Sequence, residues 1–427
     1  MKKLLFSSLL LGFGTLSMMA QSGTTSPYSQ YGLGILSDQS QTFNRGMSGL
    51  FQGFRNGAQV NMQNPASYSA VDSLSMIFDA AVSGQFTHFK EGGSAINAKT
   101  ANFEYAAALF RIFPKFGVSI GIIPYSNIGY EYTTKEKVVD SSLEASTTYD
   151  GEGGLRQVYL GLGFELFKGF SLGANVSYFW GSYDRSIMSF SSTDDDINAL
   201  TKEYEAEVSS YKLDFGMQYQ RRISKNDVLT IGATVGLGHK LGADAQMSIL
   251  NVGTAESDTT TISNALAIPL TIGGGFTIKH KNSLTIGADY NFQRWGAVDY
   301  PMTNQATGQY ELMSGFYKNR HKVTVGADWI PNPNPIARGF FKRLHYRVGA
   351  SYATPYYKIH GLDGPKELTV SAGFGIPLVN AWNNRSVLNV SLQWVNQSAK
   401  NLITDNTFRV TIGLTFNERW FAKWKVD

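Results

Sequence analysis

The chain has 427 residues, no cysteine, and 37 Lys and Arg against 33 Asp and Glu. The lack of cysteine excludes disulfides and thiolate metal sites, and a net charge of only +4 argues against a nucleic-acid-binding protein. Charged residues make up 16% of the chain, below the ~25% of typical soluble domains, whereas aromatic residues reach 13% and there are 44 glycines.

Residues 1–20, MKKLLFSSLLLGFGTLSMMA, combine a basic start, a short apolar block and a small final residue. This arrangement predicts a secretory signal peptide cleaved after Ala20, because the block is too short for a membrane helix. No later window approaches the roughly 20 apolar residues that a spanning helix needs. An exported chain with low charge, many aromatic residues and many glycines is expected to be a transmembrane β-barrel.

Residues 21–72 are glycine-rich and show no long alternating run. The segment contains too much Phe, Leu, Met and Tyr for a disordered tail, so it predicts a plug packed inside the barrel. It includes Asn64-Pro65-Ala66, where proline restricts the preceding asparagine to an extended backbone. We expect the Asn64 side chain to form hydrogen bonds with backbone groups that are left unpaired near a break in the barrel wall, which Pro124 predicts in the third strand. The alternative is a simple turn before the first strand.

From residue 73 to 417, apolar residues alternate with small or polar ones, as in a wall that faces lipid on one side and a lumen on the other. A soluble β-sandwich is the alternative, but several alternating runs exceed the five or six residues usual for its strands. The pattern predicts an all-β fold with fourteen antiparallel strands, near residues 74–88, 102–112, 116–132, 155–166, 170–187, 206–222, 228–248, 264–279, 283–295, 317–330, 344–354, 367–378, 386–396 and 406–417.

The connections between these strands alternate in length. Short turns at 113–115 and 168–169 alternate with long polar segments, which are predicted loops, at 133–154, 188–205, 249–263 and 297–316. Short turns at one end and long loops at the other are typical of outer-membrane barrels.

The third predicted strand, FGVSIGIIPYSNIGYEYTT, carries a proline in its middle. Pro124 removes a ladder donor and Gly129 allows a bulge, which a continuous wall would avoid. We therefore expect the wall to be kinked or open at this point.

The segment RGMSGLFQGFRNGAQVNMQNPASY, followed by fourteen strands, resembles the hatch and wall of FadL-type (FadL/TodX-like) outer-membrane transporters. The tail NERWFAKWKVD is similar to that of the Bacteroidota branch. The resemblance implies passive, cofactor-free uptake of long-chain fatty acids or other hydrophobic compounds, which leave sideways through a gap in the wall. It makes Asn64, Pro65 and Ala66 the hatch motif and places Pro124 and Gly129 at the lateral opening.

No motif predicts catalysis or a metal site. The sequence from Gly117 to Gly121 fits G-x-S-x-G but lies within an alternating run, and the six histidines are scattered. Basic residues accompany three aromatic residues of the tail, which resemble an interfacial anchor or alternatively a docking site for a partner: Trp420, Phe421 and Trp424. The chain thus divides into a signal peptide (1–20), a hatch (21–72), a transmembrane barrel (73–417) and a periplasmic tail (418–427).

Two function classes stay open. A transporter in the bacterial outer membrane would contact lipid, lipopolysaccharide and a hydrophobic ligand. FadL-like barrels also resemble parts of protein machines, such as the type IX secretion shuttle and barrel-assembly complexes, where the barrel is a scaffold that binds other outer-membrane or periplasmic proteins. A lumen lined by apolar pockets favours transport, whereas a sealed wall and an occluded lumen favour a scaffold.

Overall fold

The computed structural model describes residues 25–419, apart from 74, 138–143, 193–196, 252–255, 305, 335–337 and 379–385. The predicted signal peptide and the aromatic residues of the tail, Trp420, Phe421 and Trp424, lie outside the described residues. No helix in this part of the chain is long and apolar enough to cross a membrane.

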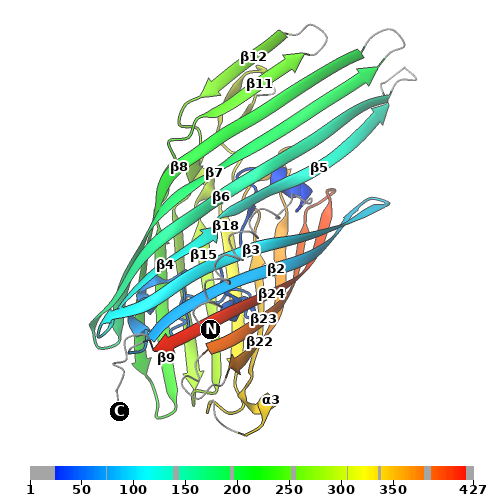
Figure 1. The fold of residues 1–427 in the computed structure, drawn as a ribbon. Coiled ribbons are helices and arrows are strands. Elements are labelled where there is room, and N and C mark those ends of the chain that lie inside the picture. Colours follow the sequence, from blue (N-terminus) through cyan, green and yellow to red (C-terminus); the bar gives the residue numbers. More distant parts are fainter. Residues whose placement is uncertain are drawn as a thin grey trace, which may run out of the picture.

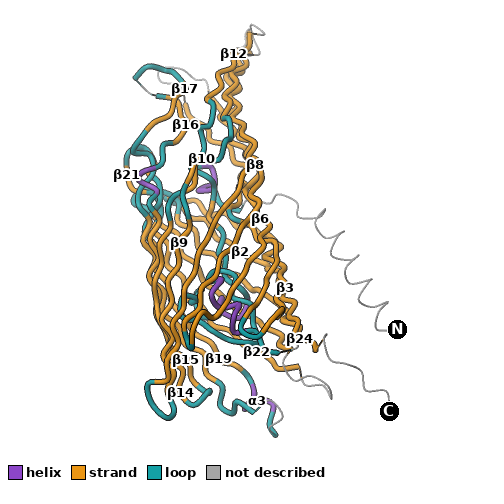
Figure 2. Tube along the Cα trace, turned by 90° about the vertical axis from the view of Figure 1, so that its left-hand side faces the viewer, coloured by secondary structure: helices purple, strands orange, loops and turns teal. Residues whose placement is uncertain are grey.

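Fourteen antiparallel strands form a closed barrel (Figures 1 and 2), as the alternation predicts. The first and last strands close the wall, in register from Ser75↔Arg419 to Lys90↔Thr404. The third predicted strand is divided into two elements, β4 and β5. In chain order the wall consists of β2 (Ser75–Glu91), β3 (Ser94–Phe113), β4 (Phe116–Pro124) with β5 (Ser126–Lys137), β6 (Glu144–Phe167), β7 (Phe170–Ser192), β8 (Ile197–Arg222), β9 (Asp227–Gly236), β14 (Thr271–His280), β15 (Leu284–Gln293), β18 (Arg320–Trp329), β19 (His345–Ala353), β22 (Lys366–Leu378), β23 (Ser386–Ser398) and β24 (Thr404–Arg419).

The alternation of residues gives the wall two chemically different faces. On β24 the outward side chains of Phe408 and Ile412 are 48% and 49% exposed, whereas the inward Thr411 and Thr415 are fully buried. Because successive side chains of a strand point to opposite faces, apolar groups face the membrane and small or polar groups face the lumen.

The structure corrects the loops predicted at 133–154, 188–205 and 249–263, because most of these residues are strand. Strands β5 to β8 continue far beyond the rest of the wall, and β11 (Ala245–Asn251) and β12 (Glu256–Ile262) add to the edge of β8. We call this part the projecting sheet: β5, β11, β12 and the portions of β6, β7 and β8 that lie beyond three glycines with positive φ, Gly153, Gly154 and Gly181. It rises above the barrel in Figure 1.

The polar composition of the projecting sheet explains the error. Its inward face buries tyrosines such as Tyr183 against the connections of the barrel, whereas its outward face carries exposed carboxylates such as Glu152 and Asp184. When one face of a sheet carries aromatic residues and the other face carries charged ones, the average polarity of its sequence is that of a loop.

Short elements lie at the two ends of the barrel. At the end that carries the projecting sheet, the connections contain β10 (His239–Lys240), β13 (Ala267–Ile268), η3 (Trp295–Ala297), β16 (Tyr300–Thr303), β17 (Tyr310–Met313), β20 (Lys358–Ile359) and β21 (Leu362–Asp363). At the opposite end, α3 (Phe340–Arg343) precedes β19 (Figure 2). Before the first wall strand, the chain forms η1 (Pro27–Gln30), β1 (Ile35–Leu36), α2 (Thr42–Arg45) and η2 (Pro65–Ala70).

Candidate functional site

Residues 42–68 follow the inside of the wall closely, at positions where the wall residues are glycine. A Cβ added to Gly216 would lie 2.2 Å from Oδ1 of Asn64, and one added to Gly349 would lie 2.3 Å from the carbonyl carbon of Met47. We call this ring of contacts the glycine belt; its further members are Gly117, Gly163, Gly173, Gly232, Gly326, Gly373 and Gly413. Side chains at these positions would displace the segment, so the alternation leaves room for backbone inside the barrel.

The Asn64-Pro65-Ala66 motif begins η2 on the inner face of β6, β7 and β8. The Asn64 amide oxygen accepts a hydrogen bond from the Ala66 N–H at 3.2 Å, and the amide nitrogen donates to the carbonyls of Gln52 at 2.9 Å and Met217 at 3.4 Å. The asparagine therefore caps a short helix and ties two parts of the N-terminal segment together. Neither of the carbonyls to which it donates lies at the break in the third predicted strand.

A buried arginine attaches the N-terminal segment to β3. Nη1 of Arg45 lies 2.8 Å from Oε2 of Glu104, and Nη2 donates to the Asp38 carbonyl at 2.8 Å. Nε of Arg45 lies 3.8 Å from the Asp38 carboxylate. Burial alone would raise the pKa of Asp38, but the charge of Arg45 outweighs it and holds that pKa well below its usual range. Sequence reasoning did not single out these three residues, because 59 positions separate Arg45 from Glu104.

The wall is open between β3 and β5. Strand β4 pairs with β3 and β6 as far as Pro124, whereas β5 pairs with β6 and with β1 of the N-terminal segment but not with β3. Pro124 faces Arg156 and Ile128 faces Gly153, so the β4–β5 side has one residue more than β6 across this stretch. The extra residue lies before Gly129, which is in regular register with Glu152. We call the space between the β3 and β5 edges the gap.

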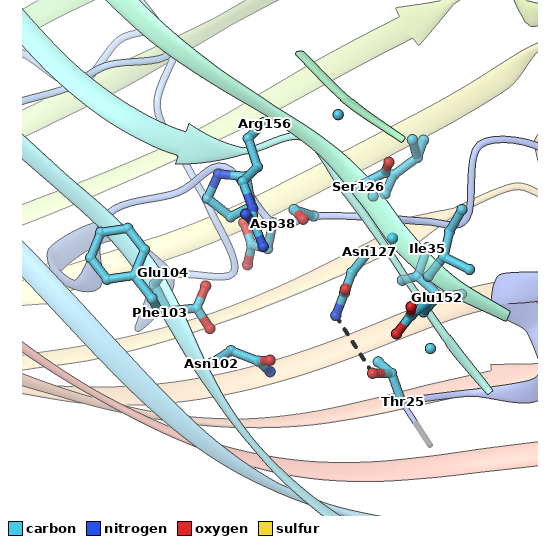
Figure 3. A pocket seen from close by; sticks show the side chains of 18 of the residues that line it. Thr25, Ile35, Asp38, Asn102, Phe103, Glu104, Ser126, Asn127, Glu152 and Arg156 are labelled. Carbon is cyan, nitrogen blue, oxygen red and sulfur yellow. Dashed lines mark hydrogen bonds between the residues drawn. The ribbon is translucent and has the colours of Figure 1, made fainter. Parts of the chain in front are cut away.

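A cavity of about 1740 Å³ passes through the gap from the lumen to the outer surface (Figure 3). Asp38 and Glu104 lie on its lumenal side, and the outward-facing Tyr178 lies at its outer mouth. Apolar side chains such as Ile35 and Phe103 line it in part, but charged residues occur all around it: Asp38, Glu104, Glu152, Arg156, Asp184, Glu205, Glu207, Asp244, Arg320, Lys322, Glu367 and Arg409. Pro124 and Gly129 line this cavity, whereas Asn64, Pro65 and Ala66 do not.

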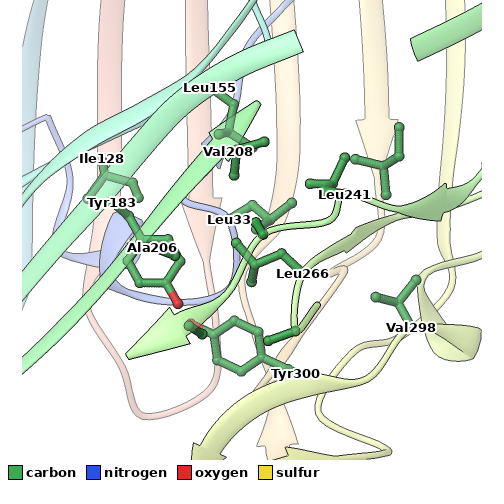
Figure 4. Packing of buried hydrophobic residues seen from close by; sticks show 14 of the residues in the cluster. Leu33, Ile128, Leu155, Tyr183, Ala206, Val208, Leu241, Leu266, Val298 and Tyr300 are labelled. Atoms are coloured by element: carbon green, nitrogen blue, oxygen red, sulfur yellow. The ribbon is translucent and has the colours of Figure 1, made fainter. Parts of the chain in front are cut away.

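An aromatic cluster covers the start of the N-terminal segment at the projecting end (Figure 4). Arg185 donates to the Gly32 carbonyl at 2.5 Å and stacks over Tyr183, and the Tyr357 hydroxyl donates to the Tyr28 carbonyl at 3.2 Å. The cluster joins residues 28–36 to the projecting sheet and to the connections after β9, β15 and β19. The lumen is thus filled at two levels, by the aromatic cluster and by the segment along the glycine belt.

Solved structures with the same fold include a hydrocarbon channel, a toluene transporter and a FadL homologue by their titles. The "CymD monoaromatic hydrocarbon channel" superposes with a TM-score of 0.58 at 13% identity, covering 90% of this chain and 98% of its own. The Ralstonia pickettii toluene transporter TbuX gives 0.57 at 14% identity, covering 88% and 97%. A Pseudomonas aeruginosa FadL homologue gives 0.56 at 12% identity, covering 88% and 97%. At identities this low the superpositions establish only the fold, which is that of a FadL-like outer-membrane barrel.

The sequence itself matches one family. The model of the BamG family matches residues 1–427. A search of curated proteins finds no match to this chain.

Proposed function

The chain belongs to the BamG family, and from that premise we propose that it is a non-catalytic accessory subunit of a protein complex in the bacterial outer membrane, such as the barrel-assembly machinery. The family name fits the scaffold alternative that the sequence leaves open. In this proposal the N-terminal segment is a permanent plug and the projecting sheet is available to other envelope proteins.

The observation that carries the proposal is the charge of the cavity in the gap. Hydrophobic ligands are bound in mostly apolar pockets that hold a small number of polar groups. Here carboxylates and guanidinium groups lie on both the lumenal and the outer side of the cavity, as Glu104 and Glu152 do. An apolar molecule that passed would have to strip water from these charges, which is costly.

The two filled levels of the lumen support the same proposal. Ligand uptake from the projecting end would require the aromatic cluster around Trp295 to open, and this side chain is fully buried. Passage towards the other end would require the segment along the glycine belt to move, together with the buried Arg45. Neither movement is needed for a scaffold.

Uptake of a hydrophobic small molecule is the second candidate, and the open wall favours it. The gap lies where the FadL resemblance expects a lateral exit, and two solved structures with this fold are a monoaromatic hydrocarbon channel and a toluene transporter by their titles. In this case Pro124 and Gly129 would flank the exit, and residues 64–66 would support the hatch from β6 to β8.

Further parts of the proposal concern the surroundings of the barrel. We place it in the outer membrane of a member of the Bacteroidota, in contact with lipid and lipopolysaccharide. A short tail after β24 then lies in the periplasm. There its aromatic residues Trp420, Phe421 and Trp424 would anchor the chain at the membrane surface or contact a periplasmic partner.

Native mass spectrometry of the tagged full-length protein, extracted from its own outer membrane in mild detergent, tests the proposal. We expect a stoichiometric complex with other envelope proteins and no small apolar adduct. A lone barrel that carries an adduct in the mass range of fatty acids would overturn the scaffold proposal and support uptake. A tagged unrelated barrel from the same membrane controls for co-extraction.

A further inference from the structure

The edge of β5 that faces the gap is partly covered by the chain itself. The Ser37 N–H donates to the Tyr125 carbonyl at 2.9 Å, Ile35 pairs with Asn127, and the Thr25 N–H donates to the Gly129 carbonyl at 2.8 Å. These contacts run along the edge as a neighbouring strand would. The first part of this edge therefore already accepts strand-like backbone.

Beyond Gly129 the same edge has no strand beside it among the described residues. Backbone groups of an antiparallel strand point alternately to its two edges, so the N–H and C=O groups of Glu131 and Thr133 face the gap, as those of Gly129 do. Across the gap, β3 pairs with β4 only from Ala106 to Phe113, which leaves the edge of Ser94–Tyr105 open as well. Open edges are ready templates for another strand.

The outward face of the projecting sheet beside this edge is acidic. Glu152 pairs with Asp184, and Asp184 pairs with Glu205, so three carboxylates lie side by side across β6, β7 and β8. Among the residues whose exposure the structure describes, the exposed carboxylates on this face are Glu131, Asp150, Glu152, Asp184, Glu203, Glu205 and Glu207. Like charges directly opposite one another destabilise a sheet. Within the described residues no salt bridge neutralises any of the seven.

The positive charges that line the cavity lie mostly on its lumenal side. Arg320 lies 3.8 Å from Glu367, and Arg409 donates to the side chain of Gln85 at 3.2 Å, both on the lumenal side. On the outward face Arg156 stands at the base of the projecting sheet, opposite Trp180, and the exposed Lys135 lies on β5, opposite Ser146. The carboxylates of this face outnumber these two described positive charges, so the outer mouth of the cavity is complementary to a cation.

We propose that the open edge of β5 and the acidic face beside it bind an extended, cationic polypeptide segment of a partner protein, which adds to β5 as a strand. Backbone hydrogen bonds to Glu131 and Thr133 supply the attachment, and the carboxylate row selects basic side chains on the outward face of the added strand. The inference deepens the proposed function, on which it rests for the existence of a partner. An anionic lipid headgroup would be repelled by the same carboxylates.

A peptide-binding measurement on the purified full-length protein in detergent tests this inference. The probe is a fluorescent nonapeptide that alternates lysine with threonine and valine, and its binding is followed by fluorescence anisotropy. We expect saturable binding that weakens as salt rises, and no binding of the same peptide with glutamate in place of lysine. Equal binding of the lysine and glutamate peptides would overturn the role of charge.

Backbone methylation separates strand addition from simple charge attraction. Two versions of the lysine peptide carry N-methyl groups on alternate residues, either on the set that faces one edge of a strand or on the other set. A strand added to β5 uses one edge only, so one version should lose binding and the other should keep it. Similar affinity of both versions would contradict strand addition.

A matched pair of double variants locates the surface. Glu152→Lys with Glu205→Lys reverses the acidic face, whereas Asp258→Lys with Asp299→Lys makes the same change in charge elsewhere at the projecting end. The first pair should lower affinity for the lysine peptide at least about tenfold, and the second should leave it nearly unchanged. Both variants must first show the circular dichroism and heat-modifiable migration of a folded barrel. Equal affinity of the two would overturn the inference.

Failure of the inference can be told apart from failure of the proposed function. If the native complex forms with Glu152→Lys/Glu205→Lys as with the parent protein, and the lysine peptide does not bind, the partner uses another surface and the scaffold proposal stands. If the lysine peptide binds as expected but no native complex is found, the binding surface stands and the accessory role fails.

Discussion

The wall at the glycine belt and the projecting sheet share the same two-residue alternation, but different types of residue occupy their inward and outward positions. In the belt the inward residue is glycine, as at Gly349, and the backbone of the N-terminal segment, the proposed plug, lies directly on the wall. In the projecting sheet the inward residue is large, as at Tyr183, and the outward residue is charged, as at Glu205. The first arrangement fixes a segment inside the barrel, and the second leaves a charged face free outside it. One barrel thus combines an interior occupied by the N-terminal segment with a charged surface outside, and the gap beside β5 joins the two.

The largest expected effect comes from removing the charge that holds the plug. Arg45→Ala leaves Glu104 and Asp38 without their buried partner, which typically costs about 3–5 kcal/mol. We expect the plug to become sensitive to protease while the barrel stays folded, as measured by limited proteolysis and heat-modifiable migration. A second variant, Arg45→Met with Glu104→Gln, removes both charges and should recover part of the loss. Unchanged proteolysis of Arg45→Ala would refute the anchoring role.

Filling the belt should have the next largest effect. Gly349→Val places a side chain where the Met47 backbone lies, and overpacking of this kind costs about 1–3 kcal/mol. The unfolding midpoint in urea should fall. Gly84→Val is the matched control, because a Cβ at Gly84 meets nothing within 4 Å. Equal midpoints for the two variants would mean that the N-terminal segment can shift away from the wall at little cost. The contrast between a rigid interior and an open surface would then be weaker.

The cap at Asn64 is expected to contribute less. Asn64→Ala removes the acceptor for the Ala66 N–H and the donor to the Gln52 carbonyl, and loss of a cap costs about 1 kcal/mol. Asn64→Ser keeps an uncharged acceptor for the Ala66 N–H and loses the donor to the Gln52 carbonyl, so its unfolding midpoint should lie between those of the parent and the alanine variant. If the two variants are equally destabilised, the bond to Gln52 rather than the cap is what matters.

The smallest effect at neutral pH concerns Asp38. Its pKa in the folded protein is lowered, so its ionised form contributes stability above the ordinary carboxyl pKa of about 3.9, and this contribution is lost as pH falls towards the lowered value. Protease resistance of the plug should therefore decline in acid. Asp38→Asn should be less resistant than the parent at pH 7 and should lose less on acidification. Parallel pH profiles for the two proteins would exclude Asp38 as the cause.

Much of the wall could be predicted because a strand's two-residue period is a local property of the sequence. The fourteen strands follow from it, and the interruption at Pro124 follows from the backbone N–H that proline lacks. The ion pair of Arg45 with Glu104 could not be found this way, since its two residues meet only when the plug lies inside the closed barrel. The projecting sheet was missed for another reason. Glu152 and Asp184 look like loop residues unless it is known that the tyrosines alternating with such carboxylates, as Tyr183 does, are buried in the aromatic cluster.

The belt also constrains the order in which the protein assembles. Thr42 donates its N–H to the Tyr105 hydroxyl on β3 at 2.9 Å, and Arg45 donates to the Thr411 hydroxyl on β24 at 3.3 Å. These contacts flank the seam where β2 meets β24. Once that seam is shut, the N-terminal segment could reach its place against the wall glycines only through an end of the barrel or through the gap beside β5. Enclosing the segment while the last strand is still being added would avoid that passage, and would link maturation of the plug to closure of the barrel.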